Sequence, residues 1–358
     1  MRRADFDVRK HDKNEVAMIY DCFTFFNELD LLEIRLNVLK DVVDKFVLVE
    51  ATQTFTGRPK PLYYKENAAR FSAFADKIIH VVVDDFSAAQ SGRTPREKAW
   101  MSESIQRNAI ARGLQVARPD DTVLISDLDE IPKPETVKKV VGLSGVTGFG
   151  MMPHVYFLNH RDYVVDDNPN AEWTHATQAL SYADFVNPRT YAKFKFNEFV
   201  PQEVNGCPSA TVVRFLKPRR TFYRSGWHFT YLGGVEAIVK KLKSFAHTEF
   251  STDEFASPEA VKARLSNSSS LSGGGGFFER LDETYPEYLV RNQEKYAALV
   301  YPVDDAYLEK VRPVKVYCDR LHDVKLFVKC RVPKPLRKLL IRLWLKLNKA
   351  PTRKGDGR

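Results

Sequence analysis

The sequence predicts an α/β fold with a mostly parallel central sheet and helices on both faces. Short apolar runs of strand length alternate with segments of helical periodicity in the amino-terminal half. This alternation is typical of doubly wound parallel sheets. The chain has 358 residues, of which 44% are hydrophobic, and this is enough for a large core. In such sheets, ligands bind beyond the carboxyl ends of the strands.

Four strands and three helices are predicted before residue 148. The strands are the apolar runs at 16–26, 44–51, 77–83 and 122–126. The helices are predicted at 27–38, at 96–114 and from Pro134 onward. The expected ligand edge comprises the residues at the strand ends, 23–28, 50–56, 84–85 and 127–130.

The texture of the sequence changes after residue 148. Aromatic-rich loops separate three predicted strands, at 149–159, 192–197 and 210–216. A helix is predicted at 235–245. The serine- and glycine-rich segment 266–276 is compatible with a linker and with a substrate lid. We therefore expect an extension at 1–15, a main domain at 16–328 with halves meeting at 147/148, and a tail at 329–358.

The positive charge of the chain is concentrated in this tail. The chain has 55 Lys and Arg against 46 Asp and Glu, a formal net charge of +9. Residues 329–358 contain eleven of these basic residues and one acid, so the tail carries +10 and the rest is close to neutral. A body that binds nucleic acid is therefore not indicated.

Targeting signals are not apparent in the sequence. The first 16 residues lack the apolar core of a signal peptide, and no apolar run reaches the ~18–20 residues of a membrane span. Cys22, Cys207, Cys318 and Cys330 form no Cys-x-x-Cys pair, which favours reduced thiols. The sequence predicts a cytoplasmic protein, or one peripheral on the inner face of the membrane.

The strongest chemical signal follows the predicted strand at 122–126. It is the run SDLDEIP at 126–132, which has three carboxylates in four residues. A divalent cation would relieve their repulsion, and oxygen ligands suit Mg²⁺ or Mn²⁺. Glycine-rich phosphate motifs of the G-x-x-x-x-G-K-S/T and G-x-G-x-x-G kinds are absent from the sequence. A diphosphate would therefore depend on the metal, although acidic turns without a metal are also common.

Five ordered segments resemble glycosyltransferase family 17. They are FFNELDLLEIRL (25–36), VLVEATQTFTGRPKPL (47–62), LISDLDEIP (124–132), SGWHFTYLGGVEAIVKKLKSFAH (225–247) and YPEYLVRNQEKYAALVYP (285–302). The resemblance implies a GT-A type fold, a UDP-N-acetylglucosamine donor, a divalent metal at Asp-x-Asp and inversion at the anomeric carbon. Eukaryotic relatives have a membrane anchor and work in an oxidising lumen, so we expect a bacterial-type member here. Its acceptor would be a glycan precursor, a glycolipid or a protein.

The resemblance also implies roles for individual residues. Asp127 and Asp129 match the metal and diphosphate motif, and His228 in Gly-Trp-His matches a late metal-binding histidine. A hydrogen-bonded core histidine is the alternative for His228. Glu50 would face the nucleotide as an acceptor of ribose or uracil hydrogen bonds, or be a surface carboxylate. Arg107 lies outside the five segments, and its position on the helix before the fourth predicted strand indicates that it would approach the nucleotide, or be a solvated helix charge.

An inverting transfer needs a carboxylate base to take the proton of the acceptor hydroxyl. Four acids on the acceptor side are candidates, namely Asp166, Asp167, Glu172 and Asp184. Glu172 is favoured because it precedes Trp173, whose ring is a suitable platform for a sugar. The alternative for each is an exposed acid in a loop.

The tail contains a basic amphipathic helix at 334–349. Its predicted apolar face comprises Leu336, Leu339, Leu340, Leu343, Trp344 and Leu347. Lys338, Arg342 and Lys346 lie on another face. This pattern favours an anionic membrane surface, and a helix docked on the body is the alternative.

The sequence thus predicts a metal-dependent inverting glycosyltransferase. It would move N-acetylglucosamine from UDP-N-acetylglucosamine to a hydroxyl of a glycan or glycoconjugate. The enzymatic alternative is a nucleotidyltransferase, which also places acids after a Rossmann-like strand. Two non-enzymatic classes remain open, a nucleotide-sugar-binding module without turnover and a nucleic-acid-binding protein that uses its tail.

Overall fold

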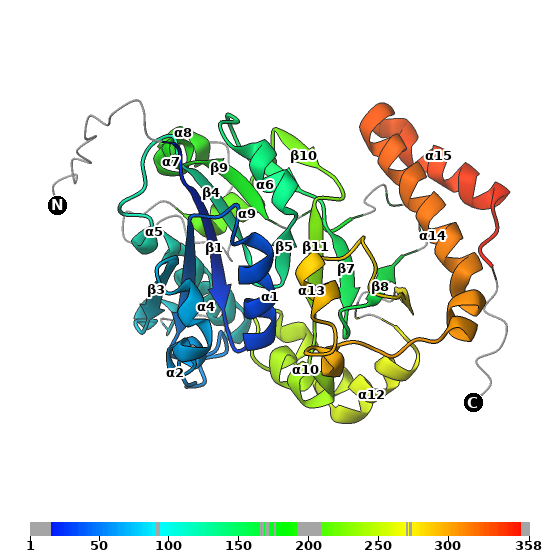
Figure 1. The fold of residues 1–358 in the computed structure, drawn as a ribbon, viewed down its shortest axis with the longest axis horizontal. Helices are drawn as coiled ribbons and strands as arrows, with labels where there is room; N and C mark the ends of the chain where they lie inside the picture. Colours follow the sequence, from blue (N-terminus) through cyan, green and yellow to red (C-terminus); the bar gives the residue numbers. More distant parts are fainter. Residues whose placement is uncertain are drawn as a thin grey trace.

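The computed structural model of the chain describes residues 16–351, except 91–93, 165, 167, 169–171, 175–176, 192–208, 270 and 272–273. Two β-sheets lie at its centre, surrounded by helices, and a long helical hairpin lies at one end of the molecule (Figure 1). The predicted α/β class, with a mostly parallel central sheet and helices on both faces, is confirmed.

The first sheet has seven strands within the described residues, in the order β10-β6-β9-β4-β1-β2-β3. They are β1 (Ile19–Phe25), β2 (Lys45–Ala51), β3 (Ile78–Val83), β4 (Thr122–Asp127), β6 (Thr147–Phe149), β9 (Gln178–Ser181) and β10 (Arg220–Phe222). The pairs β4–β1, β1–β2, β2–β3 and β10–β6 are parallel, whereas β9 is antiparallel to both its neighbours. The four strands predicted before residue 148 are confirmed.

Helices cover both faces of this sheet. One face packs against α1 (Leu29–Leu39), the 3-10 helix η1 (Ala68–Phe74) and α6 (Pro134–Val140). The other packs against α5 (Ile110–Gly113), α7 (Tyr182–Val186) and α9 (Ala210–Phe215). Apolar side chains such as Phe23 and Val47 point to opposite faces, so the strands are buried on both sides.

The second sheet has five strands within the described residues, in the order β12-β8-β7-β11-β5. They are β5 (Glu130–Pro132), β7 (Met152–Val155), β8 (His160–Tyr163), β11 (Gly226–Thr230) and β12 (Gly275–Phe278). The strand predicted at 149–159 is divided, because β6 ends at Phe149 in the first sheet and β7 begins at Met152 in the second.

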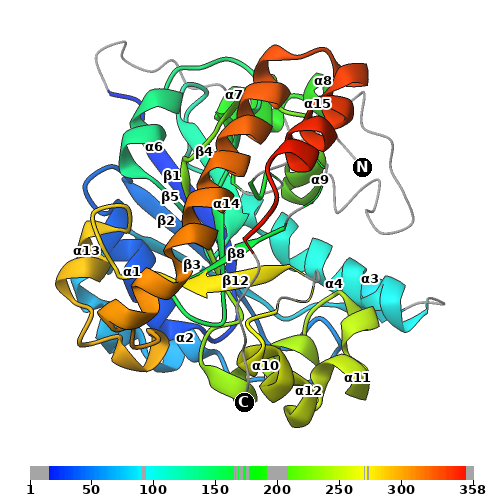
Figure 2. The same ribbon diagram turned by 90° about the vertical axis from the view of Figure 1, so that its right-hand side faces the viewer.

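The remaining helices surround the two sheets (Figures 1 and 2). They are α2 (Tyr63–Glu66), α3 (Ser87–Gln90), α4 (Pro95–Asn108), α8 (Pro188–Tyr191), α10 (Gly234–Leu242), η2 (Thr248–Phe250), α11 (Asp253–Ala256), α12 (Pro258–Ser266), α13 (Glu287–Arg291), η3 (Ala297–Leu299), α14 (Asp305–Arg331) and α15 (Lys334–Leu347). The helices predicted at 235–245 and in the tail are confirmed. The boundary predicted at 328/329 falls inside α14, and the strand predicted at 192–197 lies outside the described residues.

Two predicted elements differ from the structure. The helix predicted at 96–114 is two helices, α4 and α5, which meet at Ala109. The segment predicted as a strand at 210–216 is the helix α9. Its β-branched residues suggested a strand, but Ser209 accepts a hydrogen bond from the Val212 N–H and Asn108 accepts one from the Thr211 N–H. These contacts satisfy amide groups that a helix leaves open at its first turn.

The described residues show neither a membrane-crossing helix nor a disulfide. Within them, no helix has the length and hydrophobicity needed to cross a bilayer. Cys22, Cys318 and Cys330 are free thiols, and Cys207 lies outside the described residues.

Candidate functional site

An acidic turn joins the two sheets. Strand β4 ends in the first sheet at Asp127, and β5 begins in the second sheet at Glu130, so Leu128 and Asp129 form the link. The carboxyl ends of β1 and β4 are neighbours, since Thr24 pairs with Asp127. The predicted motif therefore lies at the ligand edge of the parallel strands.

Strand pairing brings His228 to this turn. Strand β11 is antiparallel to β5, with His228 opposite Glu130, and the Phe229 N–H donates to the Asp129 carbonyl at 2.8 Å. The close approach of the strands requires glycine at 226, because a Cβ there would lie 2.5 Å from the Ile131 carbonyl oxygen. The His228 Nε2 lies 3.7 Å from Asp129 Oδ1.

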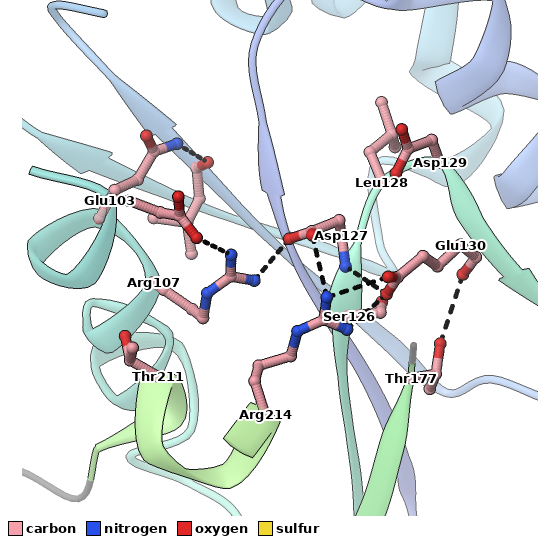
Figure 3. A network of polar contacts seen from close by, with 12 residues as sticks. Glu103, Arg107, Ser126, Asp127, Leu128, Asp129, Glu130, Thr177, Thr211 and Arg214 are labelled. Carbon is pink, nitrogen blue, oxygen red and sulfur yellow. Dashed lines mark hydrogen bonds and ion pairs between the residues drawn. The ribbon is translucent and has the colours of Figure 1, made fainter. Parts of the chain in front are cut away.

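Two arginines hold the Asp127 carboxylate. Arg107 of α4 donates to Oδ1 at 2.5 Å, and Arg214 of α9 donates to Oδ2 at 3.0 Å (Figure 3). Arg107 also donates to Glu103 at 2.6 Å. Burial alone would raise the pKa of Asp127, but the two guanidinium groups lower it to about 2. The carboxylate is thus fixed in its ionised form.

Glu130 is the buried anchor of Arg214. The guanidinium contacts both carboxylate oxygens, at 2.5 and 2.9 Å. The Asp127 N–H donates to the same carboxylate at 3.0 Å, and the Trp173 indole N–H donates at 2.9 Å. Glu130 is fully buried, so its charge needs these partners. The third acid of the motif is therefore a structural partner of Arg214.

Asp129 points away from the arginines and meets different partners (Figure 3). Lys241 of α10 donates to Oδ2 at 2.9 Å, and His228 lies near Oδ1. Burial opposes ionisation, but Lys241 and His228 hold the pKa of Asp129 well below its usual range. Burial likewise lowers the pKa of His228, and the Asp129 charge outweighs it and raises that pKa.

Arg35 of α1 fixes the backbone of the turn from behind. Its guanidinium is fully buried and donates to the carbonyl oxygens of Asp127, Leu128 and Glu130, at 3.0, 3.0 and 2.8 Å. It also donates to Ser126 Oγ and to both carboxylate oxygens of Asp21. Asp21 is itself fully buried, so the pair forms a charged support beneath the acidic turn.

A cavity of about 700 Å³ opens above the turn, between the two sheets. The carboxylates that line it are Glu28, Glu103, Asp127, Asp129, Glu130 and Asp162. The basic side chains are Lys60, Arg107, Arg214, His228, Lys241 and His247. The aromatic residues are Phe25, Phe26, Phe55, Trp100, Tyr156, Trp173, Phe215, Tyr231, Phe245 and Phe250. Such a volume, with charged groups at its base and aromatic walls, suits a ligand of nucleotide size.

Three of the predicted nucleotide and metal residues, besides Arg107, line this cavity, whereas Glu50 does not. Asp127, Asp129 and His228 are brought together as expected. The Glu50 carboxylate is fully buried and accepts from the Tyr64 N–H at 3.0 Å, with the His80 Nε2 at 3.1 Å. The expectation that it faces the nucleotide is corrected. Its carboxylate also lies 3.7 Å from the Nζ of Lys60, which lines the cavity.

The predicted base Glu172 also lies away from the cavity. It is buried, and its carboxylate accepts from the Arg224 N–H, with the His322 Nε2 at 2.9 Å. These contacts do not suit a base that faces an acceptor. Asp166 is paired with Lys325 at 2.6 Å, and Asp184 accepts from the Gly145 N–H, so neither lines the cavity. Asp167 lies outside the described residues.

Three functional neighbours were missed by the sequence reasoning. Arg214 lay in the segment predicted as a strand, so nothing directed it to the motif. Arg35 lies on the helix predicted at 27–38, and nothing in its spacing indicated a contact with the turn. Lys241 lies in the segment 225–247, and its position on a helix that follows His228 was the one available signal.

The donor set of the turn fits a divalent metal only in part. Asp129 and His228 offer a carboxylate oxygen and an imidazole nitrogen that lie close together, and the carboxylate is a ligand that Mn²⁺ and Mg²⁺ prefer. Both oxygens of Asp127 are taken up by arginines. Among the residues described, no cluster of three or more His, Cys, Asp or Glu side chains is arranged for a metal ion.

Comparison with known sequences identifies similar proteins. The profile described as Glycosyltransferase family 17 matches residues 6–182. The human beta-1,4-mannosyl-glycoprotein 4-beta-N-acetylglucosaminyltransferase is 26% identical over 303 residues, which are 79% of this chain and 54% of the human protein. The rat protein of the same name is 26% identical over 294 residues, 76% of this chain and 53% of its own length. The chain thus spans about half the length of these relatives.

Comparison with solved structures gives weaker likenesses. Glucosyl-3-phosphoglycerate synthase from Mycobacterium tuberculosis, in complex with Mn²⁺, UDP-glucose and glycerol 3-phosphate, is 14% identical, with a TM-score of 0.24. The match covers 48% of this chain and 58% of that one. An overlap of this size does not define a common fold.

Proposed function

The chain belongs to glycosyltransferase family 17, and we propose from this premise that it transfers a sugar from a nucleotide-sugar donor. The donor is UDP-N-acetylglucosamine, and the acceptor is a hydroxyl group of a glycan or glycoconjugate. One observation carries the proposal: the acidic turn at the ligand edge of the sheet opens into a cavity of about 700 Å³ together with three cationic side chains, Arg107, Arg214 and Lys241, and the imidazole of His228. The α/β fold agrees with the GT-A type that the family implies.

The basic side chains of the cavity supply hydrogen-bond donors for a diphosphate. Arg107 and Arg214 are shared with Asp127, and Lys241 and His228 flank Asp129. Lys60 adds a further amine to the cavity lining. Hydrogen bonds from charged donors in a partly buried site are stronger than those between neutral groups. These residues would bind the diphosphate and stabilise its charge as the UDP group departs.

A divalent metal, Mn²⁺ or Mg²⁺, would be held by Asp129 and His228. When bound, it would supply a positive charge next to the departing diphosphate. Lys241 donates to the Asp129 oxygen that does not face His228, so it would orient the carboxylate in the same direction. Asp127 would stay with its arginines and position the turn, rather than serve as a metal ligand.

The transfer would proceed by one displacement with inversion at the anomeric carbon. The acceptor oxygen forms a bond to the anomeric carbon as the bond between this carbon and the UDP oxygen breaks. A carboxylate takes the proton of the acceptor hydroxyl. Glu28 and Asp162 line the cavity outside the acidic turn and replace Glu172 as candidates for this base. Trp173 lines the same cavity, is 41% exposed and stacks on His228 with ring centroids 5.2 Å apart. It would support a sugar ring over the site.

The test is donor turnover by the full chain. We expect UDP release from UDP-N-acetylglucosamine in the presence of Mn²⁺, faster than from UDP-glucose. Asp129→Asn should slow release by about 10²-fold or more, whereas Asp120→Asn, an exposed control, should not. Pyrophosphate release from a nucleoside triphosphate and a sugar phosphate would instead establish a nucleotidyltransferase. Tight binding of the donor without turnover under any acceptor mixture would establish a binding module and overturn the proposal.

A further inference from the structure

The helix α15 is docked on the body through one of its faces. Ile341 is fully buried, and the Trp344 ring lies 5.4 Å from the Tyr317 ring of α14. Both residues belong to a cluster with Cys318 and Leu321. The docked face therefore includes Trp344, and the expectation that this ring shares a face with the leucines is corrected. Docking on α14 accounts for one side of the helix only.

Five leucines of α15 lie on a second face and have no cover within the described residues. They are 39–76% exposed and are Leu336, Leu339, Leu340, Leu343 and Leu347. Their spacing of three and four residues keeps them on one side of the helix. Scattered exposed leucines are ordinary, but a contiguous stripe of this kind marks an interaction surface. We refer to these five residues as the leucine face.

A third face of α15 is basic. Lys334, Lys338, Arg342 and Lys346 follow one another at intervals of four, so they form a row along the helix, the basic row. The sequence has no acidic residue between 324 and 355, so this segment of the chain has a strongly positive net charge. The basic row and the leucine face thus lie on one helix, and the row turns from the docked side at Lys334 to the edge of the leucine face at Lys346.

The hairpin of α14 and α15 lies on the outside of the molecule. Figure 1 shows it at the end of the long axis opposite β3, with α14 between α15 and the sheets. Figure 2 shows the hairpin in front of the body from the second direction. The contacts of α14 with β12 and with α15 agree with this order. A flat partner could therefore reach α15 without meeting the remainder of the fold.

We propose that the leucine face and the basic row of α15 bind an anionic lipid surface. The leucines would enter the boundary between headgroups and acyl chains, and the basic row would contact lipid phosphates. A second copy of the chain is the other possible occupant of a leucine stripe. Pairing two copies would bring together two helices of like positive charge, which is unfavourable, whereas an anionic lipid has the opposite charge. Charge complementarity therefore selects the lipid.

The test is co-sedimentation of the full chain with vesicles of phosphatidylcholine, with and without phosphatidylglycerol. We expect binding to vesicles with phosphatidylglycerol to be at least about tenfold tighter, and to weaken at high salt. The double variant Leu339→Ser/Leu343→Ser should lose about tenfold or more in affinity. Because both side chains are exposed, its thermal unfolding should match that of the wild type.

Two charge-reversed double variants distinguish the effect of the basic row from the effect of the net charge of the protein. Lys338→Glu/Arg342→Glu should lose at least about tenfold in affinity, whereas Lys138→Glu/Lys139→Glu, with the same charge change on exposed positions of α6, should lose less than about threefold. Equal losses for the two pairs would overturn the proposal, and so would unchanged binding by the leucine variant. A wild-type dimer in sedimentation that the leucine variant dissociates would assign the face to a second copy.

Discussion

The two aspartates of the acidic turn are two positions apart and meet opposite surroundings. Asp127 ends a strand of the first sheet and is held by guanidinium groups from α4 and α9, at 2.5 and 3.0 Å. Asp129 begins the passage to the second sheet and faces a lysine at 2.9 Å and an imidazole at 3.7 Å. Both contacts of Asp127 are hydrogen bonds. Of the two contacts of Asp129, only the one with the lysine is short enough to be a hydrogen bond.

This difference indicates that Asp127 stabilises the turn, whereas Asp129 and His228 are available to contact a ligand. Two planar guanidinium groups use both oxygens of Asp127 and leave little for a ligand. The 3.7 Å gap between His228 and Asp129 exceeds a hydrogen bond, so both atoms can accept a further partner. The residue pair at the second-sheet end of the turn is therefore the one to expect in contact with a metal or diphosphate, although the sequence motif treats both aspartates alike.

Substitution of Arg35 should cause the largest loss of stability, because this residue supports the backbone of the turn that contains both aspartates. Arg35→Met leaves Asp21 buried without its cation and removes donors from three carbonyls of the turn. Breaking a buried ion pair in this way costs about 3–5 kcal/mol. Urea unfolding should show this loss in the free energy of unfolding. Activity per folded molecule should fall with it, since the turn loses its support.

A second arginine that contacts the same helix supplies the control. Arg70 of η1 pairs with Asp30 and Glu33 of α1 near the surface, where its side chain is 33% exposed. Arg70→Met should cost about 1 kcal/mol or less. Equal losses for the two variants would show that Arg35 adds no support beyond a surface pair.

Substitution at the second-sheet end should reduce activity most strongly. Asp129→Asn and His228→Gln each remove one of the two donors that face each other across 3.7 Å. We expect each to lower kcat by about 10²–10³-fold, the range for losing one group that stabilises a developing charge. The Mn²⁺ concentration for half-maximal rate should rise for both. An unchanged metal dependence would place the metal elsewhere.

Substitution at the first-sheet end should lower stability and leave the metal dependence nearly unchanged. Asp127→Asn keeps the size of the side chain and removes the charge that Arg107 and Arg214 share. Hydrogen bonds to a charged group contribute about 1.5–3 kcal/mol, and the arginines keep Glu103 and Glu130, so a loss near the lower limit is expected. Thermal unfolding measures this loss. A metal dependence that shifts as much as in Asp129→Asn would show that the two ends are equivalent.

The sequence predicted the parts of this site that depend on local pattern. Continuous apolar runs identify β1, β2, β3 and β4, because strands that are buried on both faces have apolar side chains on both and therefore no polar residues at alternate positions. The position of Asp127 and Asp129 follows, since the motif comes directly after the run at 122–126. His228 lies in the same cavity, and it was the resemblance rather than a pattern that grouped it with them.

Other parts depended on contacts that no local pattern records. The segment of α9 has a threonine and two valines in succession, and a helix forms there because Ser209 and Asn108 satisfy its first amides. Glu172 precedes an aromatic residue as a base might, yet Arg224 and His322 enclose it. In each case a residue distant in the sequence determines the conformation or the surroundings of the segment, so the prediction required the tertiary structure.

Two histidines on neighbouring strands extend the comparison to the reverse side of the second sheet. His154 of β7 lies beside Phe229, the residue after His228, and packs against the rings of Phe229 and Tyr285. Burial lowers the pKa of His154 to about 3, with a further contribution from the positive Arg161. In contrast, the pKa of His228 is raised by Asp129 on the cavity side.

The lowered pKa of His154 predicts a small loss of stability in acid. An unfolded chain takes up this proton below about pH 6.5, whereas the folded protein does not until about pH 3. The native state therefore loses up to about 1.4 kcal/mol per pH unit as pH falls within that window. His154→Gln removes this dependence, so its free energy of unfolding should change less between pH 6.5 and pH 5.5 than that of the wild type, by about 1 kcal/mol. His247→Gln, at an exposed histidine, should keep the wild-type dependence. If both variants follow the wild type, His154 is open to water, and the reverse side of the sheet is no drier than the cavity.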